Sequence, residues 1–118
     1  MDQKLEQIIL KTPEYFLPDK SAGVSLIAQL NLRDDNTWDY WTLKIENQQC
    51  EVKHEKADLP QFELTISVSD LKDIITGKLN ATHAYMRGKL DLRGNIRLVL
   101  KSMELFNIPD DIWEKIQL

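Results

Sequence analysis

The sequence has few of the residues on which small stapled, metal-bound or membrane-spanning proteins depend. Its 118 residues include one cysteine, Cys50, and two histidines, so neither an internal disulfide nor a cysteine–histidine metal site is expected. No apolar run approaches the roughly 20 residues of a membrane span. The first residues, MDQKLEQ, lack the basic and apolar regions of a secretory signal. We therefore expect the chain to work in the cytoplasm, without a metal or any other cofactor.

Basic residues are in the minority overall but gather in one segment. The formal net charge is −4, which argues against nucleic acid as a partner. Between positions 78 and 101 there are six basic residues and one acid, so this segment carries +5 and the remainder −9. We expect the six to contact an anionic headgroup or, transiently, a membrane surface; the alternative is a set of solvated charges that balance an acidic body. They are Lys78, Arg87, Lys89, Arg93, Arg97 and Lys101.

Apolar and polar residues alternate in four segments, 24–33, 41–46, 50–55 and 62–68. A period of two predicts strands with one apolar face each, and turn residues separate them at 34–36 and 47–48. Four such strands in succession favour a meander that is covered on one side and wet on the other. A fifth strand, 89–93, follows a helical crossover, which permits a parallel neighbour and hence a mixed sheet.

Helix periodicity precedes the first strand and follows the fourth. Leu5, Ile8 and Ile9 share one face of a first helix, which Pro13 limits. Ser69 and Asp70 are expected to open a second helix.

Three further helices follow. Gly77 suits the left-handed position that ends the second helix, and Asn80, Asn95 and Pro109 stand where the later helices would begin. We therefore predict one α+β domain over residues 1–118. It has two layers: a five-stranded, mostly antiparallel and mixed sheet, and about five helices that cover one face.

The segment 77–95 carries a family resemblance. It reads GKLNATHAYMRGKLDLRGN and precedes an apolar helix that ends at Leu105-Phe106. It resembles the sterol-carrier-protein (type two) lipid-transfer family, which typically shows G-K-L-x-x-x-x-A-F-M-x-G-K-L-K-I-x-G-D, and the likeness extends to 41–45 and 64–71. Tyr85 departs from the usual phenylalanine by a hydroxyl, and Asn95 from the usual aspartate by a charge. The resemblance implies an apolar tunnel between sheet and helices that holds a lipid.

Catalytic groups are not arranged for chemistry in this sequence. Cys50 and His54 are about 13 Å apart along a predicted strand, beyond the reach of a nucleophile and its base. The glycine-lysine pairs at 77–78 and 88–89 lack the spacing of a phosphate-binding loop. We therefore name no catalytic residue and expect that the protein is not an enzyme.

The helix at 96–106 is apolar over more of its circumference than one sheet face requires. Such a helix either packs as core or walls a cavity, and methionines suit a lining that adapts to its ligand. With the resemblance, we predict a cavity that binds a sterol, a fatty acid or a fatty acyl-CoA, with the last helix as its lid. The expected lining residues are Leu71, Ile74, Ile75, Tyr85, Met86, Leu98, Val99, Met103, Phe106, Ile112, Trp113 and Ile116.

Two other functions stay open. The domain could be an interaction module that forms a homodimer through Trp113, Ile116 and Leu118. It could also be an accessory to an enzyme that acts on an apolar substrate, such as a quinone precursor, without transferring lipid by itself.

Overall fold

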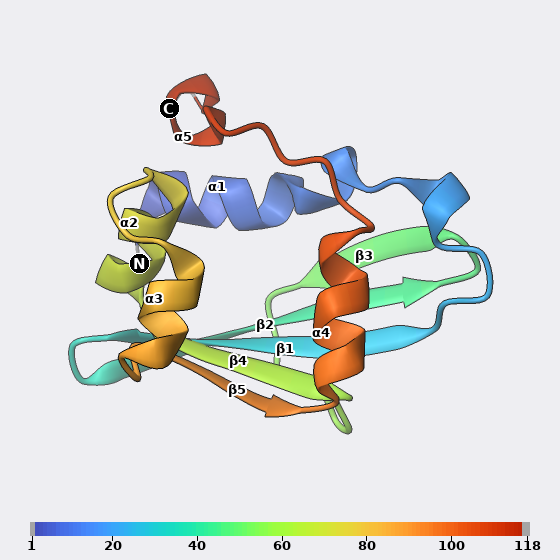
Figure 1. Cartoon of the computed structure of the whole chain (residues 1–118), viewed down its shortest axis with the longest axis horizontal. Coiled ribbons are helices and arrows are strands. Elements are labelled where there is room, and N and C mark those ends of the chain that lie inside the picture. The colour runs from blue at the N-terminus through green and yellow to red at the C-terminus, as the bar shows by residue number, and fades with distance from the viewer. Residues whose placement is uncertain (1, 117–118) are drawn as a thin grey trace.

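A five-stranded sheet carries all the helices on one face (Figure 1). The computed structural model describes residues 2–116. The strands are β1 (Leu26–Asp34), β2 (Thr37–Glu46), β3 (Gln49–Lys53), β4 (Phe62–Ser67) and β5 (Leu90–Gly94). The helices are α1 (Gln3–Lys11), α2 (Val68–Ile75), α3 (Ala81–Met86), α4 (Ile96–Met103) and α5 (Ile112–Lys115), with 3₁₀ turns at Thr12–Tyr15 and Pro18–Lys20. This confirms the predicted α+β architecture. Among the described residues, no helix has the length and apolarity to cross a membrane.

The strand order is β3-β2-β1-β4-β5, and every neighbouring pair is antiparallel except β1 and β4. The expected four-strand meander is therefore wrong, because β4 pairs with β1 and not with β3. The parallel neighbour that the crossover before β5 permits does not occur, since β5 runs antiparallel to β4. The sheet is mixed because of the β1–β4 pair.

The connection from β3 to β4 explains this order. Residues 54–61 cross the polar face of the sheet, where side chains on β1 and β2 hold them. Thr42 Oγ1 donates to the carbonyl of Glu55 at 2.7 Å, and the amide of Ala57 donates to Gln29 Oε1 at 2.8 Å. These bonds carry the chain past two strands before β4 begins.

Local turn chemistry agrees with the sequence. Asn47 and Gln48 both have positive φ, and they link the paired residues Glu46 and Gln49 as a two-residue hairpin turn. Gly77, at φ +81°, follows α2 in the expected left-handed conformation.

The start of α2 and the end of α4 differ from prediction. Ser67, not Ser69, caps α2: its Oγ accepts from the amide of Asp70 at 3.0 Å. The predicted helix to Phe106 ends at Met103, because backbone groups beyond it bond to the N-terminal segment. Leu17 N donates to Leu105 O at 2.8 Å.

The last helix begins at Ile112 and not at Pro109, and α5 lies on the outer side of α1 (Figure 1). Ile112 and Ile116 are buried against Ile8 of α1. The helical layer is therefore two helices deep at this place.

Two apolar clusters join the helices to the sheet. The first lies beneath α1 and α2 and consists of Leu5, Ile9, Leu32, Trp41 and Ile66. The second lies beneath α4 and consists of Leu26, Ala28, Ile45, Phe62, Val99 and Leu105.

Candidate functional site

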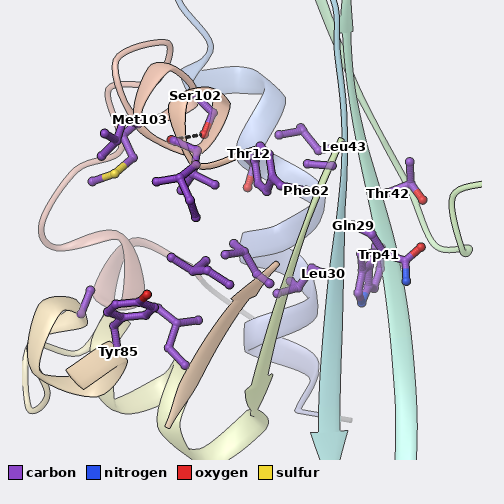
Figure 2. A pocket seen from close by; sticks show the side chains of 18 of the residues that line it. Thr12, Gln29, Leu30, Trp41, Thr42, Leu43, Phe62, Tyr85, Ser102 and Met103 are labelled. Atoms are coloured by element: carbon purple, nitrogen blue, oxygen red, sulfur yellow. Dashed lines mark hydrogen bonds between the residues drawn. The ribbon is translucent and has the colours of Figure 1, made fainter. Parts of the chain in front are cut away.

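A cavity of about 520 Å³ lies between the sheet and helices α1, α3 and α4 (Figure 2). Its volume falls within the roughly 300–1,000 Å³ typical of small-molecule sites. The floor is the apolar face of the sheet, to which all five strands contribute. The floor side chains are Ala28, Leu30, Trp41, Leu43, Val52, Phe62, Leu64, Leu90 and Leu92.

The walls come from the helices. Ile9 and Thr12 close the α1 side, α3 contributes Ala81, Thr82 and Tyr85, and α4 contributes Ile96, Val99, Leu100, Ser102 and Met103. Figure 2 shows Tyr85 and Met103 on the side of the cavity opposite Leu43 and Phe62. Leu100 and Met103 line the cavity and are nevertheless 60% and 70% exposed. The cavity therefore opens to solvent along α3 and α4.

Two of the hydroxyls in the wall present little polarity to the cavity. Thr12 Oγ1 donates to the carbonyl of Ile8 at 3.1 Å, and Ser102 Oγ donates to the carbonyl of Val99 at 2.7 Å. The other wall hydroxyls belong to Thr82 and Tyr85, and most of the remaining lining residues are apolar, so the lining offers mainly carbon. The site is suited to an apolar molecule.

One donor in the lining has no protein partner. Trp41 is 2% exposed, and its Nε1 is the buried side-chain nitrogen or oxygen that lacks a hydrogen bond within residues 2–116. The ring stacks on His54 with centroids 3.9 Å apart, and His54 also contacts Asp39. A buried, unpaired N–H costs free energy, so a ligand oxygen or a water that reached it would be stabilised there.

Charged groups are absent from the lining in the part of the chain that the structure describes. Tyr85 is its one titratable side chain, and residues 2–116 hold no cluster of histidine, cysteine and carboxylate suited to a metal. Burial raises the pKa of the Cys50 thiol to about 11, away from the thiolate form that a nucleophile needs. The described lining favours the binding of an apolar molecule.

Three of the twelve residues expected from the sequence line the cavity: Tyr85, Val99 and Met103. The other nine lie outside it. Leu71, Ile74, Ile75 and Trp113 pack against the cluster beneath α1 and α2, and Ile112 and Ile116 pack on Ile8. Leu98 and Phe106 pack on the cluster beneath α4, and Met86 is 76% exposed. The last helix thus lies on α1 and not over the opening.

Sequence reasoning left out the floor and seven wall residues: Ile9, Thr12, Ala81, Thr82, Ile96, Leu100 and Ser102. Floor residues such as Leu43, Leu64 and Leu92 were predicted as the apolar face of the sheet, and strand periodicity does not distinguish a face that is covered from one that lines a space. Ile96 and Leu100 lie one helical turn apart on α4. Their i, i+4 spacing with Met103 at i+7 was the signal that could have found them.

The six basic residues separate into two groups. Lys89 pairs with Asp70 at 3.9 Å, Arg93 with Asp91 at 2.9 Å, and Lys101 with Glu104 at 3.5 Å. Arg93 alternates with Leu92 on β5, so it lies on the polar face of the sheet, away from the cavity. Within residues 2–116, Lys78, Arg87 and Arg97 form no ion pair.

Comparison with known proteins places most of the chain in one family. The pattern of the SCP-2 sterol transfer family matches residues 5–107. Peroxisomal multifunctional enzyme A of Dictyostelium discoideum is 35% identical over 86 residues, which are 72% of this chain and 19% of that protein. The chain spans about a fifth or less of the length of the curated relatives it matches.

Solved structures share the fold. The sterol carrier protein domain 2 of Helicoverpa armigera superposes with a TM-score of 0.69 at 24% identity, covering 98% of this chain and 90% of that one. A structure described as palmitated SCP2L2 from Aedes aegypti has a TM-score of 0.65 at 22% identity, covering 86% of this chain and 88% of that one.

Proposed function

The chain belongs to the SCP-2 sterol transfer family, and we propose that it binds an apolar lipid in the cavity and transfers it without catalysing a reaction. The observation that carries the proposal is the open, carbon-lined cavity of about 520 Å³. Sterols, fatty acids and fatty acyl-CoAs are the candidate ligands. A fatty acid has a precedent in the neighbour from Aedes aegypti that is described as palmitated.

The proposed mechanism is partition of the lipid from water into the apolar cavity. Each methylene that leaves water for the lining contributes about 0.8 kcal/mol, so a chain of several methylenes supplies the affinity. Met103 at the opening can adjust to chains of different shape, because methionine is unbranched and flexible. A bound acyl chain would lie over Phe62 and Leu64, with its polar end toward Tyr85 and solvent.

Direct binding tests this proposal. A fluorescent fatty acid is titrated into the purified protein, and a sterol, a fatty acid and an acyl-CoA are then tested as competitors. Native mass spectrometry of the protein as purified identifies any lipid that it already carries. If no class of lipid binds or competes, the proposal is wrong.

A cavity-filling pair of variants tests the place of binding. Leu64→Trp enlarges a floor side chain into the cavity and should weaken fatty-acid binding by about tenfold or more, the equivalent of roughly two buried methylenes. Leu59→Trp is the matched control, because Leu59 is 85% exposed and lies outside the lining. Equal affinities in the two variants would place the ligand elsewhere.

The relatives are much longer than this chain, and this favours a second candidate function, that of an accessory domain. A multifunctional enzyme of which this chain covers 19% carries a similar segment within a longer protein. In that setting the same cavity would present an apolar substrate to a catalytic partner, or the domain would serve dimerisation. Transfer of lipid between vesicles by the isolated chain separates autonomous transfer from the accessory function, and sedimentation reports a dimer.

We also propose that the protein functions in the cytoplasm, because its one cysteine is a free thiol, as is usual in a reducing compartment.

A further inference from the structure

Five large apolar side chains stand exposed along α3 and α4, around the opening of the cavity. Their exposed fractions run from 46% to 76%. We call this set the rim: Tyr85, Met86, Ile96, Leu100 and Met103. Exposed apolar side chains gathered on one face mark a surface that meets another apolar phase.

Three basic side chains follow rim residues directly in the sequence. Arg87 follows the last residue of α3, and Arg97 and Lys101 each come one position after a rim residue of α4. Neither α3 nor α4 contains an aspartate or glutamate. Among the described residues the one carboxylate paired to these three cations is Glu104, at the C-terminal end of α4. An apolar stripe flanked by arginine and lysine is the pattern of helices that lie at the surface of an anionic bilayer.

Two other faces of the molecule carry a different pattern of charge. On the polar face of the sheet Lys44 pairs with Glu46 and Lys53 with Glu51, and the exposed ring of Trp38 stacks on Tyr40. The segment at α5 is acidic, with Asp110, Asp111 and Glu114 against Lys115. A negatively charged surface would therefore attract the rim and repel the α5 side.

A second copy of the chain is a poorer partner for this face. Two rims brought together would oppose Arg87, Arg97 and Lys101 of one copy to the same cations of the other. A lipid bilayer fits the position of the cavity opening better, because a ligand could pass between the acyl region of the bilayer and the cavity without crossing water.

From this geometry we propose that the α3–α4 face docks on an anionic phospholipid bilayer with the cavity opening toward the membrane. This inference rests on the proposed lipid-binding function. The rim side chains enter the interfacial region, and Arg87, Arg97 and Lys101 contact lipid phosphates.

Co-sedimentation with vesicles tests the docking. The protein should sediment with phosphatidylcholine vesicles that contain phosphatidylglycerol, and much less with phosphatidylcholine alone, and added salt should weaken the binding. Arg87→Gln combined with Arg97→Gln should weaken binding roughly twentyfold, at roughly fivefold for each charge lost. Lys44→Gln combined with Lys53→Gln makes the same change in net charge on the polar face of the sheet and should change binding by less than about threefold.

The apolar contribution has its own pair of variants. Met86 is 76% exposed and lies outside the cavity lining, so Met86→Ser removes a rim side chain without changing the cavity. It should weaken vesicle binding roughly fivefold. The control is Leu10→Ser on α1, where Leu10 is 44% exposed, and a loss there of less than about twofold is expected.

Three results would overturn the docking face. The first is no binding of the unaltered protein to anionic vesicles, the second is an equal loss in the two double variants, and the third is a larger loss for Leu10→Ser than for Met86→Ser. Displacement of a fluorescent fatty acid in vesicle-free buffer reports the cavity separately. Displacement without vesicle binding rejects the docking face and leaves the proposed function intact; vesicle binding without displacement rejects the proposed function and supports the docking face.

Discussion

The helices cover the two halves of the sheet in different ways (Figure 1). In the closed half, beneath α1 and α2, Leu5 and Leu32 are fully buried. In the open half, beneath α3 and α4, comparable apolar side chains surround a cavity of about 520 Å³. Both halves rest on the same strands, and Trp41 on β2 belongs to the lining of one and to the cluster of the other.

The difference follows from helix placement. The nine-residue α1 lies along the sheet and is backed by α5. In contrast, α3 has six residues and α4 eight, and no helix of residues 2–116 covers their outer side. Val99 and Leu105 hold α4 to the sheet, while Leu100 and Met103 stay exposed. Equal apolarity therefore gives a stable core in one half and a candidate ligand site in the other.

Replacing one leucine by alanine in each half should give the largest difference in the free energy of unfolding. Leu5→Ala removes a fully buried side chain and should lower the free energy of unfolding by about 3 kcal/mol. Leu100→Ala removes a side chain that is 60% exposed and should cost about 0.5 kcal/mol or less. Urea unfolding of lipid-free protein measures both. Similar losses in the two variants would show that the open half is packed like the closed one.

The substitution Trp113→Ala tests whether α5 stabilises the closed half or takes part in ligand binding in the open half. The ring of Trp113 lies beneath the ammonium groups of Lys4 and Lys72, at 4.8 and 5.1 Å, and packs against the closed half. Its removal should cost about 2 kcal/mol of stability, since the side chain is only partly buried. Fatty-acid affinity should change less than about twofold, because methylenes in the cavity keep their contacts. A tenfold loss of affinity would instead make α5 part of the binding site, as the sequence predicted.

Capping residues provide a smaller comparison between the halves. Asp2 Oδ1 accepts from the amide of Lys4 at 2.9 Å in α1, and Asn95 Oδ1 accepts from the amide of Arg97 at 3.1 Å in α4. Asp2→Ala and Asn95→Ala should each cost about 1 kcal/mol in thermal or urea unfolding. Asp2→Asn and Asn95→Asp keep a capping oxygen and serve as controls. If either control loses as much as its alanine variant, the cap is not the cause.

The Cys50 thiol, on β3, is tested by its rate of reaction. Because burial raises its pKa from 9.0 to about 11, the folded protein should hold about a hundredfold less thiolate than the unfolded chain below pH 9. Reaction with a disulfide reagent, followed against pH, measures this. Stability from this group is full below the unfolded pKa and falls as pH rises from 9 toward 11.

Cys50 also serves as a control for ligand binding. It packs on the cluster beneath α4 but does not line the cavity. A fatty acid in the open half should therefore leave the reaction rate of the thiol unchanged; a strong slowing would mean that the ligand reaches Cys50, beyond the described lining.

Local features of the fold were predictable from the sequence. The alternation from Leu26 to Leu32, the turn at Asn47-Gln48 and the caps at Asn80 and Asn95 all appear in the structure as expected. Each depends on neighbours within a few residues, so the residue types alone decide it.

The pairing of strands and the identity of the lining were decided only by tertiary structure. The partner of β4 depends on a loop that Thr42 and Gln29 hold across the sheet, and no local pattern encodes that contact. A helix with a broad apolar surface has more than one face that can turn toward the sheet, so its sequence does not say which side chains will meet a filled space and which an empty one. The separation of α3 and α4 from the floor, which makes Tyr85 and Met103 cavity residues and Leu98 a core residue, is set by packing between segments far apart in the chain.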